Sequence, residues 1–137
     1  MDERQSGLGD EAAIRGVVEA WTAAVRRRDM AGILRDHSPD MVMFDVPPPF
    51  QSRGIKAYER SWDLFFSWSS DPVVFDVTEM SITAGPDVAF VVATMRCSTP
   101  GADGKAEGLD FRLTIGLRKI DGRWAITHEH HSVPAVD

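Results

Sequence analysis

The chain has a single cysteine, Cys97, no pair of cysteines at CxxC spacing and no long apolar run. One thiol cannot form an internal disulfide, and without paired cysteines the common zinc motifs are excluded. No apolar stretch approaches the ~20 residues that a membrane-spanning helix needs. The segment from Met1 to Asp10 is polar, so we expect no signal peptide and a cytoplasmic protein.

Positive charge is also scarce. The 15 Lys and Arg residues are outnumbered by 21 Asp and Glu residues, which gives a net charge of −6. An acidic chain without a basic stripe is a poor partner for nucleic acid or for an anionic membrane surface. The glycine-rich phosphate loop and the Gly-x-Ser-x-Gly elbow are both missing, so nucleotide chemistry and serine hydrolysis have no support.

The overall composition and length of the chain are typical of one folded domain. Hydrophobic residues make up 43% of the 137 residues and charged residues 26%, close to the average for globular proteins. This length fits one domain of ~150 residues, and we expect a flexible N-terminus at 1–9 followed by a single domain at 10–137. One local feature departs from the average, because five of the twelve aromatic residues lie between Tyr58 and Trp68.

Hydrophobic spacing predicts helices in the first half of the chain and mainly strands in the second. Apolar residues at helical spacing follow Asp10, Asp29 and Gly54, so three helices are expected to begin near these residues. Asp10 and Asp29 are expected to cap the first two. Apolar, β-branched and alternating runs predict five strands, at 41–46, 73–83, 88–98, 107–120 and 123–133. This order predicts an α+β cone, in which three N-terminal helices pack on a strongly curved, mostly antiparallel sheet.

Asp45 is the most informative residue of the first predicted strand. It shares a strand face with Met41 and Met43, and the residues beside it are all apolar. Burial among apolar neighbours disfavours a charged carboxylate and raises its pKa toward the range of a general base. The alternative interpretation is structural, with Asp45 accepting backbone hydrogen bonds from the proline-rich loop at 47–50.

Three of the four histidines lie close together in the last predicted strand. Strict alternation places His128, His130 and Ser132 on the apolar face that looks toward the helices. With a two-residue turn at 121–122, Ile115 lies opposite His128. A histidine on that face can move a proton, orient a ligand or be a hydrogen-bonded core residue.

The same alternation places Glu129 and His131 on the outer face, near Arg112 and Thr114. That face is more polar and suits solvent or a partner subunit. The register is sensitive, because a slip of one residue would exchange His130 for His131 on the inner face.

Two other kinds of chemistry are not expected. A His-x-His pair could bind a metal if a third ligand such as Asp45 converged on it, but nothing in the spacing demands this, and we expect no metal site. Cys97 shares a strand face with Met95 and Ala93, which indicates a small core residue rather than a nucleophile.

The aromatic segment has two interpretations. Tyr58, Trp62 and Phe65 form a stripe at helical spacing, which is typical of a hydrophobic core. Together with Phe66 and Trp68, however, these rings are bulky for a domain of this size. They could instead line an apolar ligand cavity.

Several of these features recur together in one superfamily. They are the order of elements, Ala20-Trp21-Thr22, Asp29-Met30, Phe44-Asp45 before a proline loop, Gly54, and the ending Asp121-Gly122-Arg123-Trp124 through His130-x-Ser132. On these motifs the chain, from about residue 10 to 134, resembles the NTF2-like superfamily, and within it SnoaL-like proteins and ketosteroid isomerases.

The resemblance implies a pocket and a general base. In ketosteroid isomerases the base is an aspartate at the end of the first strand, and Asp45 matches that position. Their oxyanion hole is a tyrosine in the first helix and a protonated aspartic acid on a later strand. The matching positions here are Trp21 and, approximately, Ile115, so steroid isomerisation by that mechanism is not expected. SnoaL-like enzymes pair a pocket aspartate with polar partners, which His128 or His130 could supply.

We therefore expect a cofactor-independent enzyme that isomerises, cyclises or dehydrates an apolar, carbonyl-containing small molecule. Asp45 would remove a proton next to the carbonyl, and His128 or His130 would donate to the oxygen or return the proton. The residues expected to contact substrate are Trp21, Phe44, Tyr58, Trp62, Phe65, Ile115 and Ser132.

The alternative is a ligand-binding or dimerisation module without catalysis. Its cavity would be filled by its own aromatic side chains. Its outer sheet face, with Arg112, Thr114, Glu129 and His131, would form a homodimer interface, because a sheet that helices cover on one side only favours such pairing. Both hypotheses include the homodimer, and they differ in the cavity.

Overall fold

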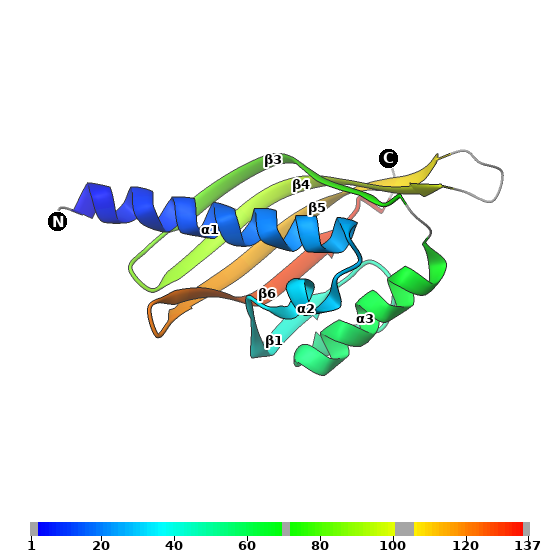
Figure 1. Ribbon diagram of the computed structural model, residues 1–137, viewed down its shortest axis with the longest axis horizontal. Helices are drawn as coiled ribbons and strands as arrows, with labels where there is room; N and C mark the ends of the chain where they lie inside the picture. The colour runs from blue at the N-terminus through cyan, green and yellow to red at the C-terminus, as the bar shows by residue number, and fades with distance from the viewer. Residues whose placement is uncertain (1–2, 70–71, 101–105, 136–137) are drawn as a thin grey trace.

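The computed structural model describes residues 3–69, 72–100 and 106–135. Its elements are, in chain order, α1 (Glu3–Arg26), α2 (Met30–Leu34), β1 (His37–Phe44), β2 (Ser52–Arg53), α3 (Ile55–Trp68), β3 (Val74–Ala84), β4 (Val88–Pro100), β5 (Ala106–Ile120) and β6 (Arg123–Ser132). The six strands form one sheet of order β2-β1-β6-β5-β4-β3 (Figure 1). Neighbouring strands are antiparallel except for the parallel pair β1 and β6. The predicted α+β class with three helices on a curved sheet is confirmed.

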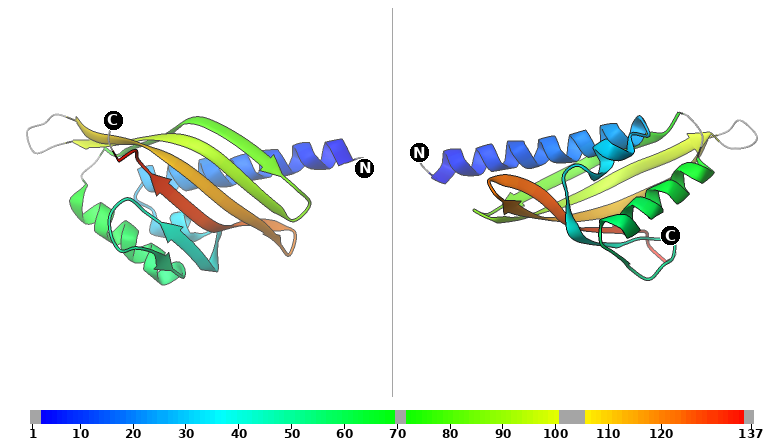
Figure 2. Two further views of the ribbon diagram at one scale, coloured as in Figure 1. Left: turned by 180° about the vertical axis from the view of Figure 1, so that it is seen from behind. Right: turned by 60° about the horizontal axis from the view of Figure 1, so that its bottom comes forward.

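The helices cover one face of the sheet, which we call the inner face. α1 packs along β3, and α3 packs on β1 and β2 at the end of the molecule (Figure 1). Viewed from behind, the strands lie in front of α1 (Figure 2). Ile14 and Val18 of α1 belong with Leu113 and Ile115 of β5 to one core that excludes solvent from these side chains, and each such burial stabilises the fold by roughly 1.5–3 kcal/mol. None of the described helices combines the length and the apolar character needed to cross a membrane.

α1 begins seven residues before Asp10, its expected cap. The prediction that Asp10 caps this helix is wrong, because the helix begins at Glu3. The Asp10 carboxylate instead pairs with Lys119 Nζ at 2.8 Å and accepts a hydrogen bond from Trp124 Nε1 at 3.1 Å. These two interactions lower the pKa of Asp10. They tie the helix to the β5–β6 hairpin, so a tertiary contact uses the carboxylate that a cap would need.

Other local signals are confirmed. The Asp29 side chain accepts from Gly32 N at 3.2 Å and caps α2. Gly54 precedes α3 with φ at 87°, a conformation that favours glycine. Asp121 and Gly122 both have positive φ, 51° and 79°, as the two-residue hairpin turn requires.

β1 starts at His37 rather than at Met41, the predicted start. Its first residue lies opposite Ile126 of the parallel neighbour β6. Pairing with β6 brings the first residues of β1 into the sheet although their own sequence has no strand pattern. The apolar pattern therefore predicts only the part from Met41 onward.

A β-bulge in β6 reverses the predicted orientation of the histidines. Leu117 pairs with Ile126 and Gly116 pairs with His128, which leaves Thr127 as an extra residue. One extra residue moves every following side chain to the opposite face of the sheet.

The predicted placement of His128 and His130 on the inner face is therefore wrong. Glu129 and His131 occupy that face, opposite Ile115 and Leu113, and their exposed fractions are 0% and 8%. Before the bulge the even-numbered residues Trp124 and Ile126 face inward. After it, side chains still alternate between the faces, but the odd-numbered residues face inward.

Candidate functional site

A cavity of about 630 Å³ opens where α3 covers one end of the sheet. Its walls come from the end of β1 and the proline loop after it, from α3, and from the ends of β3, β4 and β5. Most of its lining is apolar, and the larger side chains are Met43, Val46, Trp62, Leu64, Phe65, Trp68, Phe75, Leu109 and Phe111. Asp45 and His131 are the carboxylate and the imidazole among its described lining residues.

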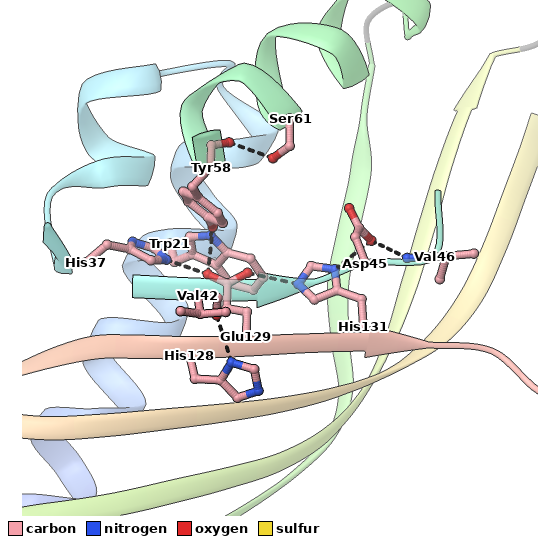
Figure 3. A network of polar contacts seen from close by, with 10 residues as sticks. All are labelled: Trp21, His37, Val42, Asp45, Val46, Tyr58, Ser61, His128, Glu129 and His131. Atoms are coloured by element: carbon pink, nitrogen blue, oxygen red, sulfur yellow. Dashed lines mark hydrogen bonds and ion pairs between the residues drawn. The ribbon is translucent and has the colours of Figure 1, made fainter. Parts of the chain in front are cut away.

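Asp45 follows the last residue of β1 and lies on the inner side with Met41 and Met43, as the alternation of the strand predicts. Its side chain is 27% exposed. The carboxylate accepts a hydrogen bond from Val46 N at 2.8 Å, and its Oδ1 lies 3.6 Å from His131 Nδ1 (Figure 3). Asp45 thus makes a local backbone hydrogen bond and also faces a titratable group at the edge of the cavity.

His131 lies between two carboxylates. Its ring stacks on Phe111 with 5.3 Å between centroids, and Trp21 meets it edge-on at 6.4 Å. Nε2 donates to Glu129 Oε1 at 2.8 Å, on the side away from Asp45 (Figure 3). Burial by itself would lower the pKa of His131, but the hydrogen bond and charge of Glu129, together with the charge of Asp45, raise it above its ordinary value of 6.5.

Glu129 is a fully buried carboxylate with three donors around it. Tyr58 OH donates to its Oε2 at 2.7 Å, His37 Nε2 meets the same oxygen, and His131 holds the other oxygen (Figure 3). Burial would raise its pKa, but electrostatic attraction from His37 and the hydrogen bonds from the two histidines lower it to about 2. Glu129 is therefore an anion at neutral pH although it is shielded from water.

Tyr58 connects this carboxylate to α1. Trp21 Nε1 donates to Tyr58 OH at 2.9 Å, and the hydroxyl in turn donates to Glu129. Burial and the charge of Glu129 raise the pKa of Tyr58 well above its ordinary value of 10, so the phenol stays neutral and acts as a donor. We call Glu129, Tyr58 and His37 the buried cluster.

The expected substrate contacts fall into three groups. Trp62 and Phe65 line the cavity. Trp21, Tyr58 and Ile115 are buried in the core and are not among the lining residues.

Phe44 and Ser132 form the third group and lie on the outer face. The Phe44 ring packs against His128 and His130 at 4.9 and 5.4 Å between centroids. Ser132 Oγ accepts from Arg112 Nε at 3.1 Å. Their placement follows from the same alternation and bulge that turn His128 and His130 outward.

Cys97 lines the cavity although alternation predicts only a small core residue. Burial raises the pKa of its thiol to about 11, which leaves it a poor nucleophile at neutral pH. Within the described ranges, no three His, Cys, Asp or Glu side chains gather in a way that could hold a metal ion.

Sequence reasoning assigned Glu129 to an outer-face dimer interface and gave His37 no role. Glu129 lies in the run His128-Glu129-His130-His131, and a carboxylate inside a histidine-rich strand was the available signal. His37 carried no signal, because its burial depends on the parallel pairing of β1 with β6.

Comparisons with known proteins agree with the fold. The family model for the SnoaL-like domain matches residues 14–136. An NTF2-like protein of unknown function from Pseudomonas putida KT2440 is 32% identical at a TM-score of 0.85, with 93% of this chain and 88% of that chain covered. No curated protein matches the chain.

Two more distant structures show the same fold. A ketosteroid isomerase-like protein from Erwinia carotovora atroseptica is 20% identical at a TM-score of 0.74, with 90% of this chain and 96% of that chain covered. An NTF2-like protein with a cystatin-like fold from Novosphingobium aromaticivorans is 13% identical at a TM-score of 0.85, with 98% and 88% covered.

Proposed function

Since the chain belongs to the SnoaL-like domain family of the NTF2-like superfamily, we propose that it is an acid–base enzyme that moves a proton next to a carbonyl group of an apolar small molecule. The observation that carries this proposal is the pair Asp45 and His131, 3.6 Å apart at the edge of an apolar cavity. The reaction class is isomerisation, cyclisation or dehydration.

Asp45 is the proposed general base. Its carboxylate takes the proton from the carbon beside the carbonyl. The electron pair of the broken C–H bond forms a C=C bond, and the π pair of the carbonyl moves onto its oxygen. His131 donates from Nδ1 to that oxygen, which is the role that the sequence suggested for His128 or His130. The proton on Asp45 then returns to another carbon or to a leaving oxygen. Such chemistry needs positioned side chains and a dry site, and no cofactor enters it.

The cavity suits an apolar substrate. Its volume of about 630 Å³ lies within the range of ligand pockets, roughly 300–1,000 Å³. Trp62 and Phe65 provide flat apolar walls, and the charged or titratable side chains of the lining include Asp45, His131 and Arg60. The site is not filled by its own aromatic residues, which supports the enzyme hypothesis over a closed module.

The experiment uses 2-tetralone, a bicyclic ketone with acidic C–H bonds beside its carbonyl. NMR in D2O follows deuterium incorporation at those carbons with and without protein. We expect the wild-type protein to accelerate exchange, and Asp45→Asn or His131→Gln to lose most of the acceleration. His128→Gln is the matched control, because that ring lies on the outer face and should leave the rate unchanged. Exchange at the buffer rate with wild-type protein, or full exchange with Asp45→Asn, would contradict the proposal.

A homodimer through the outer sheet face is a second proposal. The register places Val92, Thr114, His130 and Phe44 side by side across β4, β5, β6 and β1. Val92 is 51% exposed and its strand neighbour Phe90 is 49% exposed. Exposed apolar side chains gathered on one face of a sheet are typical of an interaction site. The bulge removes Glu129 and His131 from the interface that alternation predicts.

Sedimentation equilibrium tests this surface. We expect twice the monomer mass for the wild-type protein and a monomer for Phe90→Arg. Phe50→Arg is the control, because Phe50 is 97% exposed in the proline loop. A monomeric wild-type protein would reject the dimer.

A further inference from the structure

The proposed proton transfer uses Asp45 and His131 but leaves the buried cluster behind them without a role. Glu129, Tyr58 and His37 have almost no contact with solvent, and Glu129 accepts from all three neighbouring donors. Removing a carboxylate from water costs several kcal/mol unless it is paired and hydrogen-bonded. A buried charge beside the cavity therefore needs cationic character among its neighbours, and His37 and His131 are the titratable bases in contact with it.

Tyr58 is a neutral donor, because burial and the charge of Glu129 raise its pKa. His37 meets Glu129 through Nε2 alone, and its Nδ1 is buried without a hydrogen-bond partner among the described residues. The remaining neighbour of Glu129 is His131, which can carry the charge because both of its ring nitrogens face carboxylates.

The second N–H of a cationic His131 is directed to the cavity side. Its Nδ1 lies 3.6 Å from Asp45 Oδ1, which is longer than the roughly 2.7–3.2 Å of a formed hydrogen bond. The groups around the ring are Glu129 of the same strand, Asp45 beyond β1, and the aromatic rings of Phe111 and Trp21. The Nδ1 donor is thus held near a carboxylate but is not bound to it, and a ligand oxygen can accept from it.

We propose that the buried cluster holds His131 as a cation, so that the cavity binds ligands with an ionised oxygen, such as enolates and phenolates, in preference to their neutral forms. This inference rests on the proposed function, because it assigns the cavity as the ligand site. Glu129 is a positioning residue in this scheme: it never touches the ligand, and it sets the charge and ring orientation of the donor that does.

The direction in which the pKa of a bound phenol shifts distinguishes a cationic His131 from burial of the phenol alone. An apolar cavity disfavours the charged form and raises the pKa of a phenol, whereas an adjacent cation lowers it. 4-Nitrophenol reports its ionisation by absorbance, and 4-nitroanisole has nearly the same shape but cannot ionise. The Asp45→Asn protein is the host, because the neutral amide removes the carboxylate that competes with a phenolate and resembles Asp45 after it has taken a proton.

We expect Asp45→Asn protein to bind 4-nitrophenol with its pKa lowered by at least about one unit, a tenfold change in the ionised ratio. Adding Glu129→Gln should abolish the shift. The affinity for 4-nitroanisole should change by no more than about twofold, well below the tenfold change that ~1.4 kcal/mol represents. Adding Tyr58→Phe is the matched control. It also removes a hydrogen bond from Glu129 but leaves the carboxylate charge, so the shift should persist.

Two measurements keep the test decisive if Glu129→Gln fails to fold. His131→Gln removes the cation itself and should abolish the shift. An NMR titration of the His131 ring in the Asp45→Asn protein should show a cation at neutral pH, which a merely structural Glu129 would not require.

A bound 4-nitrophenol whose pKa is unchanged or raised would overturn the inference, as would a shift that survives Glu129→Gln. Failure of either probe to bind at millimolar concentration would also overturn it. The readout is ligand ionisation and not turnover. If 2-tetralone does not exchange but the phenol pKa falls, the proton-transfer function is rejected and this inference stands; the reverse result rejects this inference alone.

Discussion

Replacing the buried carboxylate Glu129 with glutamine should destabilise the protein substantially near neutral pH. The pKa of Glu129 falls from an ordinary value of 4.5 to about 2 on folding. At roughly 1.4 kcal/mol per unit, this shift represents about 3 kcal/mol of folding free energy. Loss of one partner from a buried ion pair costs a similar amount, about 3–5 kcal/mol. The amide group of the substituted side chain would also present a donor to a group that already donates.

The pH dependence of this difference follows from two opposite shifts. Because the pKa of Glu129 is lowered, its contribution is present above pH 4.5 and is lost as the pH falls toward about 2. Because the pKa of His131 is raised, its contribution is present below pH 6.5 and is lost as the pH rises through its folded value. The stability difference between wild type and Glu129→Gln should therefore be largest between pH 4.5 and 6.5.

Urea unfolding at a series of pH values measures this difference, since urea does not screen charges as guanidinium does. Glu79→Gln is the matched control, because Glu79 lies exposed on β3. Its free energy of unfolding should stay within about 0.5 kcal/mol of wild type. The reasoning is refuted if Glu129→Gln costs less than about 1 kcal/mol at pH 6, which is the range of an exposed ion pair, or if its loss does not vary with pH.

Three further predictions concern neighbouring residues. Asp45→Asn removes a negative charge 3.6 Å from His131, so an NMR titration should show a lower pKa for His131; an equal or higher value would contradict the described geometry. The pKa of Cys97 is about 11, so thiol reagents should react slowly at neutral pH, and 4-nitroanisole in the cavity should slow them further rather than leave the rate unchanged. Gly32→Ala would bring a Cβ to 2.7 Å from Asp29 Oδ2. It should weaken the α2 cap and lower the free energy of unfolding by about 1 kcal/mol, which is measured as a lower urea midpoint. An unchanged midpoint would reject this role of the cap.

Local signals in the sequence predicted a large part of the fold. Asp29 as a cap and the turn at Asp121 and Gly122 depend on residues close in the chain, and both are present. Helix α1 shows the limit of such signals. Asp10 looks like a cap from its neighbours, but Lys119 and Trp124, more than one hundred residues away, hold its carboxylate.

The candidate site divides in the same way. Alternation along 41–46 places Asp45 with Met41 and Met43, and the structure has these residues on the inner side. The same rule fails along β6 because of the bulge at Thr127. No residue pattern in β6 alone marks that position, since a bulge is a property of the pairing between two strands.

By itself, the sequence determined that this chain forms one α+β domain, where its turns and most of its elements lie, and that an aspartate ends the first strand beside apolar residues. Its periodicity carries this information because helices and strands repeat locally. Only the tertiary structure decided that Glu129 and His131 face the helices and that His37 and Tyr58 meet Glu129. This arrangement follows from a bulge in the pairing of β5 with β6 and from the parallel pairing of β1 with the distant β6. Neither is visible in one strand alone, and the stability of a buried charge depends on the partners that the fold brings to it.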